Sequence, residues 1–183
     1  MTVDVDEPIQ VVSYDPAWPQ LFLSEAERLR NHLSVPITAI EHFGSTSVAG
    51  MAGKPIVDLL MGVDDMQQAH KVAGEVAGLG YENLGEVLWP GRVYLRRRGP
   101  PNFNVVVVAH QGDLWKYFTI LRDYLRSQPD EVEAYSNAKW EAINSGASMF
   151  LEYSHEKGPF LKTMSERALR WKSMNRDSRS AAS

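Results

Sequence analysis

The chain has 183 residues, of which 44% are hydrophobic and 23% are charged, the size and composition of one globular domain. It contains no cysteine, so disulfides, thiolate zinc sites and a cysteine nucleophile are excluded. Its net charge of -4 and its pI of about 5.7 argue against a general nucleic-acid binder, which is usually basic.

Hydrophobic periodicity predicts an α/β fold, because helical spacing of apolar residues alternates with short β-branched runs. The expected elements in chain order are an extended arm over 1–16, a helix over 16–33, a strand over 37–43, a short helix within the flexible segment 44–53, a buried strand over 55–63, a helix over 64–80, strands near 81–88, 92–98 and 103–109, and helices near 112–127, 130–144 and 147–172. This order predicts a mixed β-sheet flanked by helices, with a helical C-terminal third.

Local signals refine these boundaries. Asp64 is the expected N-cap of the second helix, since a short acidic side chain accepts bonds from free helix N–H groups. Gly158 and the proline after it indicate a break in the last helical segment. We expect one domain over residues 1–172 and a flexible polar tail over 173–183.

The segment EHFGSTSVAGMAGKPIVDLL combines a glycine turn, hydroxyl groups and a cation. Gly44 permits a sharp turn and lets the backbone approach a ligand closely. Three hydroxyls follow it, from Ser45, Thr46 and Ser47. A helix that begins there offers free N–H groups to an anion. The combination indicates a phosphate site, to which Lys54 adds a positive charge.

Asp58 follows inside an apolar strand. A carboxylate there is costly unless it is paired, metal-bound or at the open end of the strand. An Mg²⁺ ion shared with a triphosphate would relieve that cost, because Mg²⁺ prefers a few carboxylates together with phosphate oxygens. The alternative is an ordinary loop followed by an aspartate that bonds a helix terminus or an arginine. The residues alone leave both interpretations open.

At these residues the chain resembles the GrpB family, a group of nucleotidyltransferase-like proteins also found fused to dephospho-CoA kinase. The resemblance extends from about Val11 to Trp171 and rests on the stretches VVSYDPAWPQLF, IEHFGSTSVAGMAGKPIVDLL, LRDYLRSQP, YSNAK and YSHEKGPF. It implies a nucleotidyltransferase fold, in which Gly44 and Ser45 face a triphosphate and Asp58 binds a metal ion.

Two departures from the pattern that the resemblance implies bear on mechanism. The wider superfamily has a second carboxylate two residues after the first, where this chain has Leu60. The family has a His-Leu-His run entering its last core strand, where this chain has Asn102, Phe103 and Asn104. Asparagine is not a base near neutral pH and is a poor metal ligand. The first departure weighs against two-metal catalysis, and the second implies that any chemistry done by those histidines in relatives is altered or lost here.

Two further groups of candidates come from the strand before the turn and from a later helix. Glu41 and His42 are adjacent on a strand and therefore point to opposite faces, where a structural hydrogen bond is favoured over a functional role. Arg122, Asp123 and Arg126 lie on one expected helix, and the two arginines share a face. They either clamp phosphates or form an ion-pair stripe in solvent.

Tyr153 and Lys157 are four residues apart on a late helix and match the family. They either reach across the cleft to the triphosphate or form a surface pair, and Lys139 is a weaker candidate of the same kind. Arg96 and Arg98 lie in a basic strand that would suit an anionic ligand or nucleic acid. A charged edge strand is the favoured interpretation of that run.

These observations predict a Mg²⁺-dependent nucleotide-binding transferase that passes a nucleotidyl group from ATP, or another nucleoside triphosphate, to a small-molecule acceptor, with Asp58 and Ser45 catalytic. The alternative is a non-catalytic module that binds a nucleotide or small anion on the same fold. Nucleic acid is not an expected partner. No apolar run approaches a bilayer span, and the acidic start lacks the features of a signal peptide, so we expect a cytoplasmic protein, as monomer or homodimer.

Overall fold

The structure is a computed structural model that describes residues 5–180, with side chains up to Asn175. Its elements in chain order are α1 (Trp18–His32), β1 (Ala39–Phe43), the 3₁₀ turn η1 (Ser45–Ser47), β2 (Ile56–Val63), α2 (Met66–Gly78), β3 (Glu82–Gly85), β4 (Arg92–Arg97), β5 (Asn102–Ala109), α3 (Asp113–Ser127), α4 (Pro129–Asn144), α5 (Phe150–Glu156) and α6 (Gly158–Ser180). The predicted mixed α/β fold with a helical C-terminal third is confirmed.

The strands of residues 5–180 form one sheet in the order β1-β2-β5-β4-β3. The pair β2 and β5 is parallel, and the other neighbouring pairs are antiparallel. β5 therefore lies between β2 and β4, although it follows β4 in the chain. The expectation that the basic run over 92–98 is an edge strand is wrong, because β4 is enclosed by β5 and β3.

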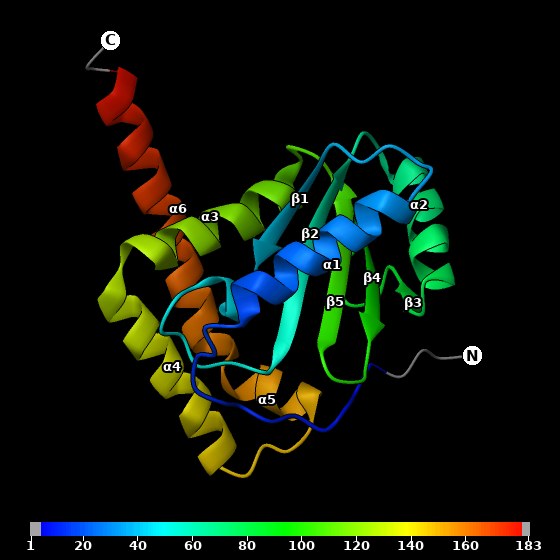
Figure 1. Cartoon of the computed structure of the whole chain (residues 1–183). Coiled ribbons are helices and arrows are strands. Elements are labelled where there is room, and N and C mark those ends of the chain that lie inside the picture. The colour runs from blue at the N-terminus through cyan, green and yellow to red at the C-terminus, as the bar shows by residue number, and fades with distance from the viewer. Residues whose placement is uncertain (1–4, 181–183) are drawn as a thin grey trace.

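The two faces of the sheet have different partners. Leu59 of β2 packs in one buried cluster with Leu29 of α1, and Figure 1 shows α1 crossing in front of the sheet with α2 beside it. Because side chains alternate along a strand, Asp58 and Leu60 point to the opposite face. There Leu60 packs in a second cluster with Trp115 of α3. Asp58 therefore faces the C-terminal helices rather than α1 and α2.

The helices α3 to α6 gather on one side of the molecule, and α6 extends away from the sheet (Figure 1). The loop between β1 and β2 reaches into them, since Met51 is buried against Met164 of α6. The N-terminal arm closes the same region through an isolated bridge from Val12 to Gly53. The arm, the loop and the helices thus enclose the space in front of Asp58.

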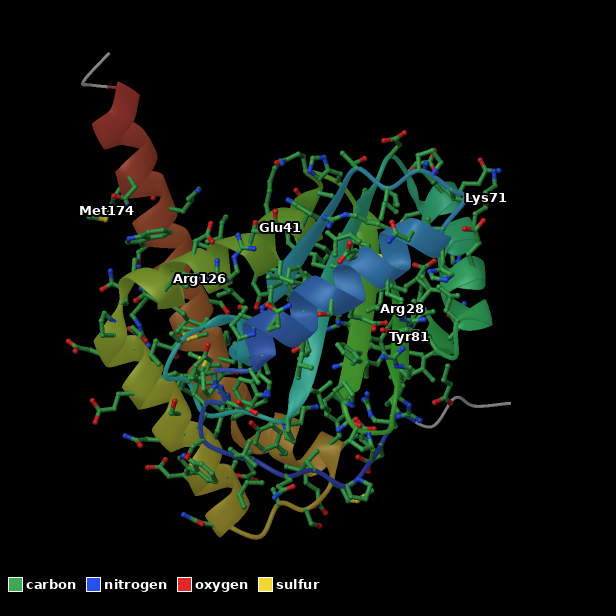
Figure 2. The ribbon with its side chains drawn as sticks, in the orientation of Figure 1. Arg28, Glu41, Lys71, Tyr81, Arg126 and Met174 are labelled. Carbon is green, nitrogen blue, oxygen red and sulfur yellow. The ribbon has the colours of Figure 1, made fainter. Side chains whose placement is uncertain are left out.

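A buried acid explains part of the basic run in β4. Glu25 of α1 accepts bonds from Arg28 at 2.6 Å, from Tyr81 at 2.8 Å and from Arg97 at 3.1 Å. Figure 2 shows Arg28 and Tyr81 side by side where α1 crosses the sheet. Burial raises the pKa of Glu25, but the bonds from Arg28 and Tyr81 outweigh it and hold that pKa below its usual range. Arg97 is thereby committed to holding α1 on the sheet.

Several boundaries differ from the expected ones. The N-cap of α2 is Asp65 rather than Asp64, because Asp65 accepts the bond from the N–H of Gln68. The break at Gly158 separates α5 from α6. α6 continues to Ser180, so most of the expected flexible tail over 173–183 is helical, and residues 181–183 lie outside the described residues. Within residues 5–180, no helix combines the length and the apolarity that a membrane span requires.

Candidate functional site

A cavity of about 260 Å³ opens over the face of the sheet that carries Asp58. Its walls come from the turn after β1, from β2, β4 and β5, and from α3 to α6. The polar residues that line it are Gly44, Ser45, Thr46, Lys54, Asp58, Arg92, Tyr94, Asn104, Arg122, Tyr135, Tyr153 and Lys157. Predicted residues from four separate parts of the sequence therefore meet in one cavity.

The turn after β1 passes directly over the Asp58 carboxylate. β1 and β2 are antiparallel, and Phe43 is paired with Asp58, so Gly44 follows beside it. Gly44 has φ of 70°, and a Cβ added there would overlap Asp58 Oδ2. A residue with a side chain would be strained in this backbone conformation and would displace the carboxylate. Glycine is needed here for both reasons.

Asn104 holds the other carboxylate oxygen. It is paired with Asp58 across the parallel strands, and its Nδ2 donates to Asp58 Oδ1 at 2.7 Å. The Asn104 Oδ1 accepts from the Tyr94 hydroxyl at 2.9 Å and from Arg98 at 3.0 Å, which fixes the amide with its N–H groups toward Asp58. Arg98 is held in turn by Glu7 at 2.7 Å. A chain of polar contacts thus orients the acid from behind.

The electrostatics of Asp58 combine two opposed effects. Burial raises the pKa of its carboxyl group, while the bond from Asn104 and the positive charges of Lys54, Arg98 and Lys157 lower it, and the net shift is upward. Asp58 Oδ2 faces Gly44 at the cavity. The site therefore holds an acid whose charged form is favoured by the bond from Asn104 and by the cations around it.

Three lysines from separate segments are gathered around the cavity, two in its lining and one buried behind Ser45. Lys139 of α4 is 1% exposed, and its Nζ donates to Ser45 Oγ and to the Ala52 carbonyl, each at 2.7 Å. Lys54 and Lys157 line the cavity beside Asp58. Burial lowers the pKa of Lys54 and of Lys157 to about 8, and it lowers the pKa of Lys139 well below its ordinary value.

Aromatic rings surround the same ammonium groups. Lys139 Nζ lies 4.1 Å from the centre of the Tyr135 ring, and Lys157 Nζ lies 4.6 Å from that of Tyr153. Lys54 Nζ lies 4.5 Å from the Phe150 ring. None of these ammonium groups forms a salt bridge with a carboxylate of the described side chains. The cavity therefore has an excess of positive charge.

The three hydroxyls of the turn have different surroundings. Ser45 meets Lys139 at the cavity. Thr46 Oγ1 is buried against His42 Nε2 at 3.0 Å, and Ser47 Oγ donates to the Gly44 carbonyl at 2.7 Å. Of the predicted hydroxyls, Ser45 is therefore the one placed to meet a ligand, and those of Thr46 and Ser47 shape the turn.

The two arginines of α3 also have different contacts. Arg122 lines the cavity and donates to Glu41 at 2.7 Å, and it is paired with Asp123 at 2.8 Å. Arg126 donates twice to the Ser47 carbonyl, at 3.0 and 2.9 Å, and Figure 2 shows it on α3, away from Glu41. Arg126 therefore fastens the turn to α3 without lining the cavity, whereas Arg122 lines the cavity and bonds to β1.

The remaining predicted residues have structural surroundings. His42 points away from the cavity and stacks on Phe22 of α1 at 4.7 Å, and burial lowers its pKa to about 4. Asn102 accepts from the Gly99 N–H and donates to the Pro55 carbonyl. Arg96 is paired with Glu82 at 2.7 Å. None of these side chains lines the cavity.

The donor set limits which metal ions the cavity suits. Asp58 is the one acidic residue among the lining residues, and Leu60, in the second acidic position, is fully buried. No group of three histidine, cysteine, aspartate or glutamate residues gathers anywhere in the described part of the chain. A single carboxylate, that of Asp58, fits at most one Mg²⁺ ion that shares phosphate oxygens. It does not fit a pair of metal ions.

Sequence reasoning gave Lys139 little weight, placed Arg92 only within a basic run interpreted as an edge strand, and gave no role to Tyr94. A signal existed for each. Tyr135 and Lys139 are four apart on α4 and so share a face, and Arg92, Tyr94 and Arg96 alternate on one face of β4. Neither pattern reveals that the face in question lines a cavity, because that depends on the strand order.

The fold and the cavity define a mixed α/β protein with a cationic pocket over one face of its sheet. The chain belongs to the GrpB family, because the family model described as GrpB protein matches residues 8–167. It is similar to the UPF0157 protein YqkA of Bacillus subtilis, with 31% identity over 90% of this chain and 48% of that protein. A UPF0157 protein of Pseudomonas aeruginosa is 36% identical over 73% of this chain and 57% of its own length. The chain thus spans about half the length of these two relatives.

A solved structure supports the same assignment. The crystal structure of conserved protein GrpB from Enterococcus faecalis superposes with a TM-score of 0.81 and 30% sequence identity, and the match covers 89% of this chain and 99% of that chain. The strand order and the C-terminal helices are therefore features of a fold already seen in a relative.

Proposed function

We propose that the cavity binds the triphosphate of a nucleotide and that the protein transfers the nucleotidyl group to a small-molecule acceptor. The observation that carries this proposal is the convergence of Lys54, Lys139 and Lys157 on Ser45 and Asp58. Membership of the GrpB family supports it, because the family is nucleotidyltransferase-like. ATP is the expected nucleotide.

The charge of the cavity favours a polyanion over a single anion. Buried ammonium groups are costly without a counter-charge, and the depressed pKa values of Lys54 and Lys157 express that cost. A triphosphate carries several negative charges along a short chain, so it can meet all three lysines together. Hydrogen bonds from charged donors to phosphate oxygens are about twice as strong as neutral ones.

The residues have distinct roles in this proposal. Lys139 and Ser45 would hold one phosphate, and Lys54 and Lys157 would neutralise charge on its neighbours. Asp58 would hold one Mg²⁺ together with phosphate oxygens, and the ion would supply further neutralisation of phosphate charge when bound. In nucleotidyl transfer, positioning and charge neutralisation supply most of the catalysis.

The group transfer itself is a displacement at phosphorus. The acceptor oxygen forms a bond to the α-phosphorus, and the bond from that phosphorus to the oxygen bridging to the β-phosphate breaks. Pyrophosphate leaves with the electron pair, and the acceptor proton passes to solvent. The lysines stabilise the charge that develops on the leaving pyrophosphate.

The second candidate is a binding module that keeps the pocket without catalysis. Leu60 favours it, because the position of a second metal ligand is filled by a buried apolar side chain. Asn104 favours it as well, since its amide is fixed by Tyr94 and Arg98 and only holds Asp58 in place. Release of pyrophosphate from ATP in the presence of candidate acceptors separates the two functions.

Calorimetric titration of ATP tests the proposed binding, with the wild type, Asp58→Ala and the control Lys71→Met, which removes an exposed lysine on α2 remote from the cavity (Figure 2). With Mg²⁺, Asp58→Ala weakens binding because the metal loses its protein ligand. In EDTA, the same variant does not weaken binding, because without metal the carboxylate only repels phosphate. ATP binding that is absent, or equal in all three proteins under both conditions, contradicts the proposal.

A further inference from the structure

Arg92 is an arginine of the cavity that has no acidic partner. Its Nε is buried without a hydrogen-bond partner among the described residues, and none of their carboxylates forms a salt bridge with it. The other arginines of this run are all paired, Arg96 with Glu82, Arg97 with Glu25 and Arg98 with Glu7. The cationic run of β4 is therefore neutralised except at the cavity.

Aromatic rings hold the Arg92 guanidinium in place. Its Cζ lies 5.3 Å from the centre of the Trp89 ring and 5.5 Å from that of Tyr94. Trp89 is itself stacked on Phe118 of α3, with ring centres 5.9 Å apart. Burial lowers the pKa of Arg92, although a guanidinium stays charged in proteins. The result is a rigid, partly desolvated cation that lines the cavity.

The register of the sheet separates Arg92 from the lysines. Asn104, beside Asp58, is paired with Arg96, whereas Arg92 lies four residues further along β4. At about 3.3 Å per residue, the two positions are about 13 Å apart along the strand. Val106, opposite Tyr94, lies between them on β5, and Leu88 and Phe118 also line the cavity. The cavity thus has a cationic group at each end and apolar walls between.

This layout specifies the chemistry of a second ligand. A single cation in an apolar surrounding matches a single negative charge, since a second charge would be buried without a partner. The planar fork of a guanidinium suits a carboxylate, which it can bind through two parallel hydrogen bonds. The walls between the two ends suit an apolar chain or ring.

We propose that the acceptor of this site is an apolar carboxylic acid, bound with its carboxylate on Arg92 and its body against Leu88, Val106 and Phe118. The inference rests on the proposed function in that it names the second substrate of the same cavity. Binding of the acid does not itself require a nucleotide. The group that receives the nucleotidyl moiety lies at the end of the molecule remote from the carboxylate, toward Asp58.

A matched pair of probes tests the carboxylate without nucleotide. We would titrate 3-phenylpropanoate and 3-phenylpropan-1-ol into the wild type, Arg92→Met, Arg92→Lys and the control Arg30→Met, which removes an exposed arginine of α1. The wild type and Arg30→Met are expected to bind the acid about tenfold tighter than the alcohol, or more, as a charged hydrogen-bonded pair gives. Arg92→Met loses this preference, and Arg92→Lys keeps part of it.

Three results would overturn the inference: equal or undetectable binding of acid and alcohol by the wild type, a preference that persists in Arg92→Met, or a preference abolished by Lys54→Met instead. Circular dichroism melting of each variant shows whether it folds. If Arg92→Met does not fold, Arg92→Lys serves as the second variant. A separate ATP titration distinguishes the two proposals. ATP binding without the acid preference removes this inference alone, and the acid preference without ATP binding removes the proposed nucleotide function alone.

Discussion

Substitution of Gly44 by alanine tests the contact on which the site geometry depends. A Cβ at this position would overlap Asp58 Oδ2 and would lie 3.1 Å from its Cγ and 3.3 Å from its Cβ. The backbone φ of 70° with ψ of -172° is a conformation that only glycine adopts readily, so any side chain adds a cost of about 1–3 kcal/mol. Displacement of the carboxylate from a filled site adds about 1–3 kcal/mol. We therefore expect Gly44→Ala to lower the free energy of unfolding by about 2–6 kcal/mol.

A double-mutant cycle with Asp58→Ala isolates the contact. In that background the overlap with Oδ2 and Cγ is gone, and the Asp58 Cβ, 3.3 Å from the new methyl group, needs to move by only a few tenths of an ångström. Gly44→Ala should then cost about 1–3 kcal/mol, mainly the backbone contribution. The loss of the bond from Asn104 is common to both arms of that comparison and cancels. Urea unfolding of the four proteins gives the coupling free energy, expected at about 1–3 kcal/mol. Additive effects would show that the turn does not press on the carboxylate and would refute the reasoning.

Four further predictions concern charge. Lys139→Met should weaken ATP binding by about 10- to 150-fold in calorimetry, which corresponds to one lost charged hydrogen bond; an unchanged affinity would exclude Lys139 from the phosphate site. Because burial lowers the pKa of Lys54 and Lys157 to about 8, ATP affinity should fall as pH rises above 8, and a flat profile from pH 7 to 9.5 would contradict their role. In the protein without ligand, the same lowered pKa values make the free energy of unfolding rise with pH between pH 8 and the ordinary lysine pKa of 10.5, because the unfolded chain binds more protons there. Urea titrations across this window should show that increase. Glu25→Gln should lower the free energy of unfolding by about 3 kcal/mol, as expected when one partner of a buried ion pair is removed, and chemical denaturation would show no effect if the cluster around Glu25 were not formed.

The sequence was sufficient for the parts of the fold that depend on local pattern. The β-branched runs in β2 and β5 and the helical spacing in α1 predict elements that the structure confirms. The N-cap at Asp65 was missed by one residue, because two adjacent aspartates give the same local signal. The edge-strand assignment of β4 failed for a different reason. Strand order depends on the pairing of β5 with β2, which no local pattern encodes.

In the candidate site, too, local sequence predicts some contacts, and others depend on tertiary packing. Gly44 and Asp58 are brought together by an antiparallel hairpin, so their spacing in the sequence already indicates their proximity. Lys139 meets Ser45 across 94 residues of sequence, and Arg92 meets the cavity only because β4 lies beside β5. Such contacts arise from tertiary packing and leave no periodic trace. Lys54 and Lys157 were therefore predicted from their motifs, whereas Lys139 and Arg92 depend on tertiary packing and were ranked low.

The parallel pairing of β2 with β5 has a consequence for how the chain acquires its shape. Antiparallel pairing forms two groups of strands, β1 with β2 and β3 with β4 and β5, and the strands within each group are close in sequence. The two groups meet where β2 pairs with β5, and there the bond between Asp58 and Asn104 spans 46 residues. Closing such long loops is slow compared with making hairpins. A chain in which both groups have formed but β2 has not yet paired with β5 would have native-like strands and no cavity. During refolding, ligand binding should therefore appear only when β2 pairs with β5, after the spectroscopic signal of secondary structure has formed.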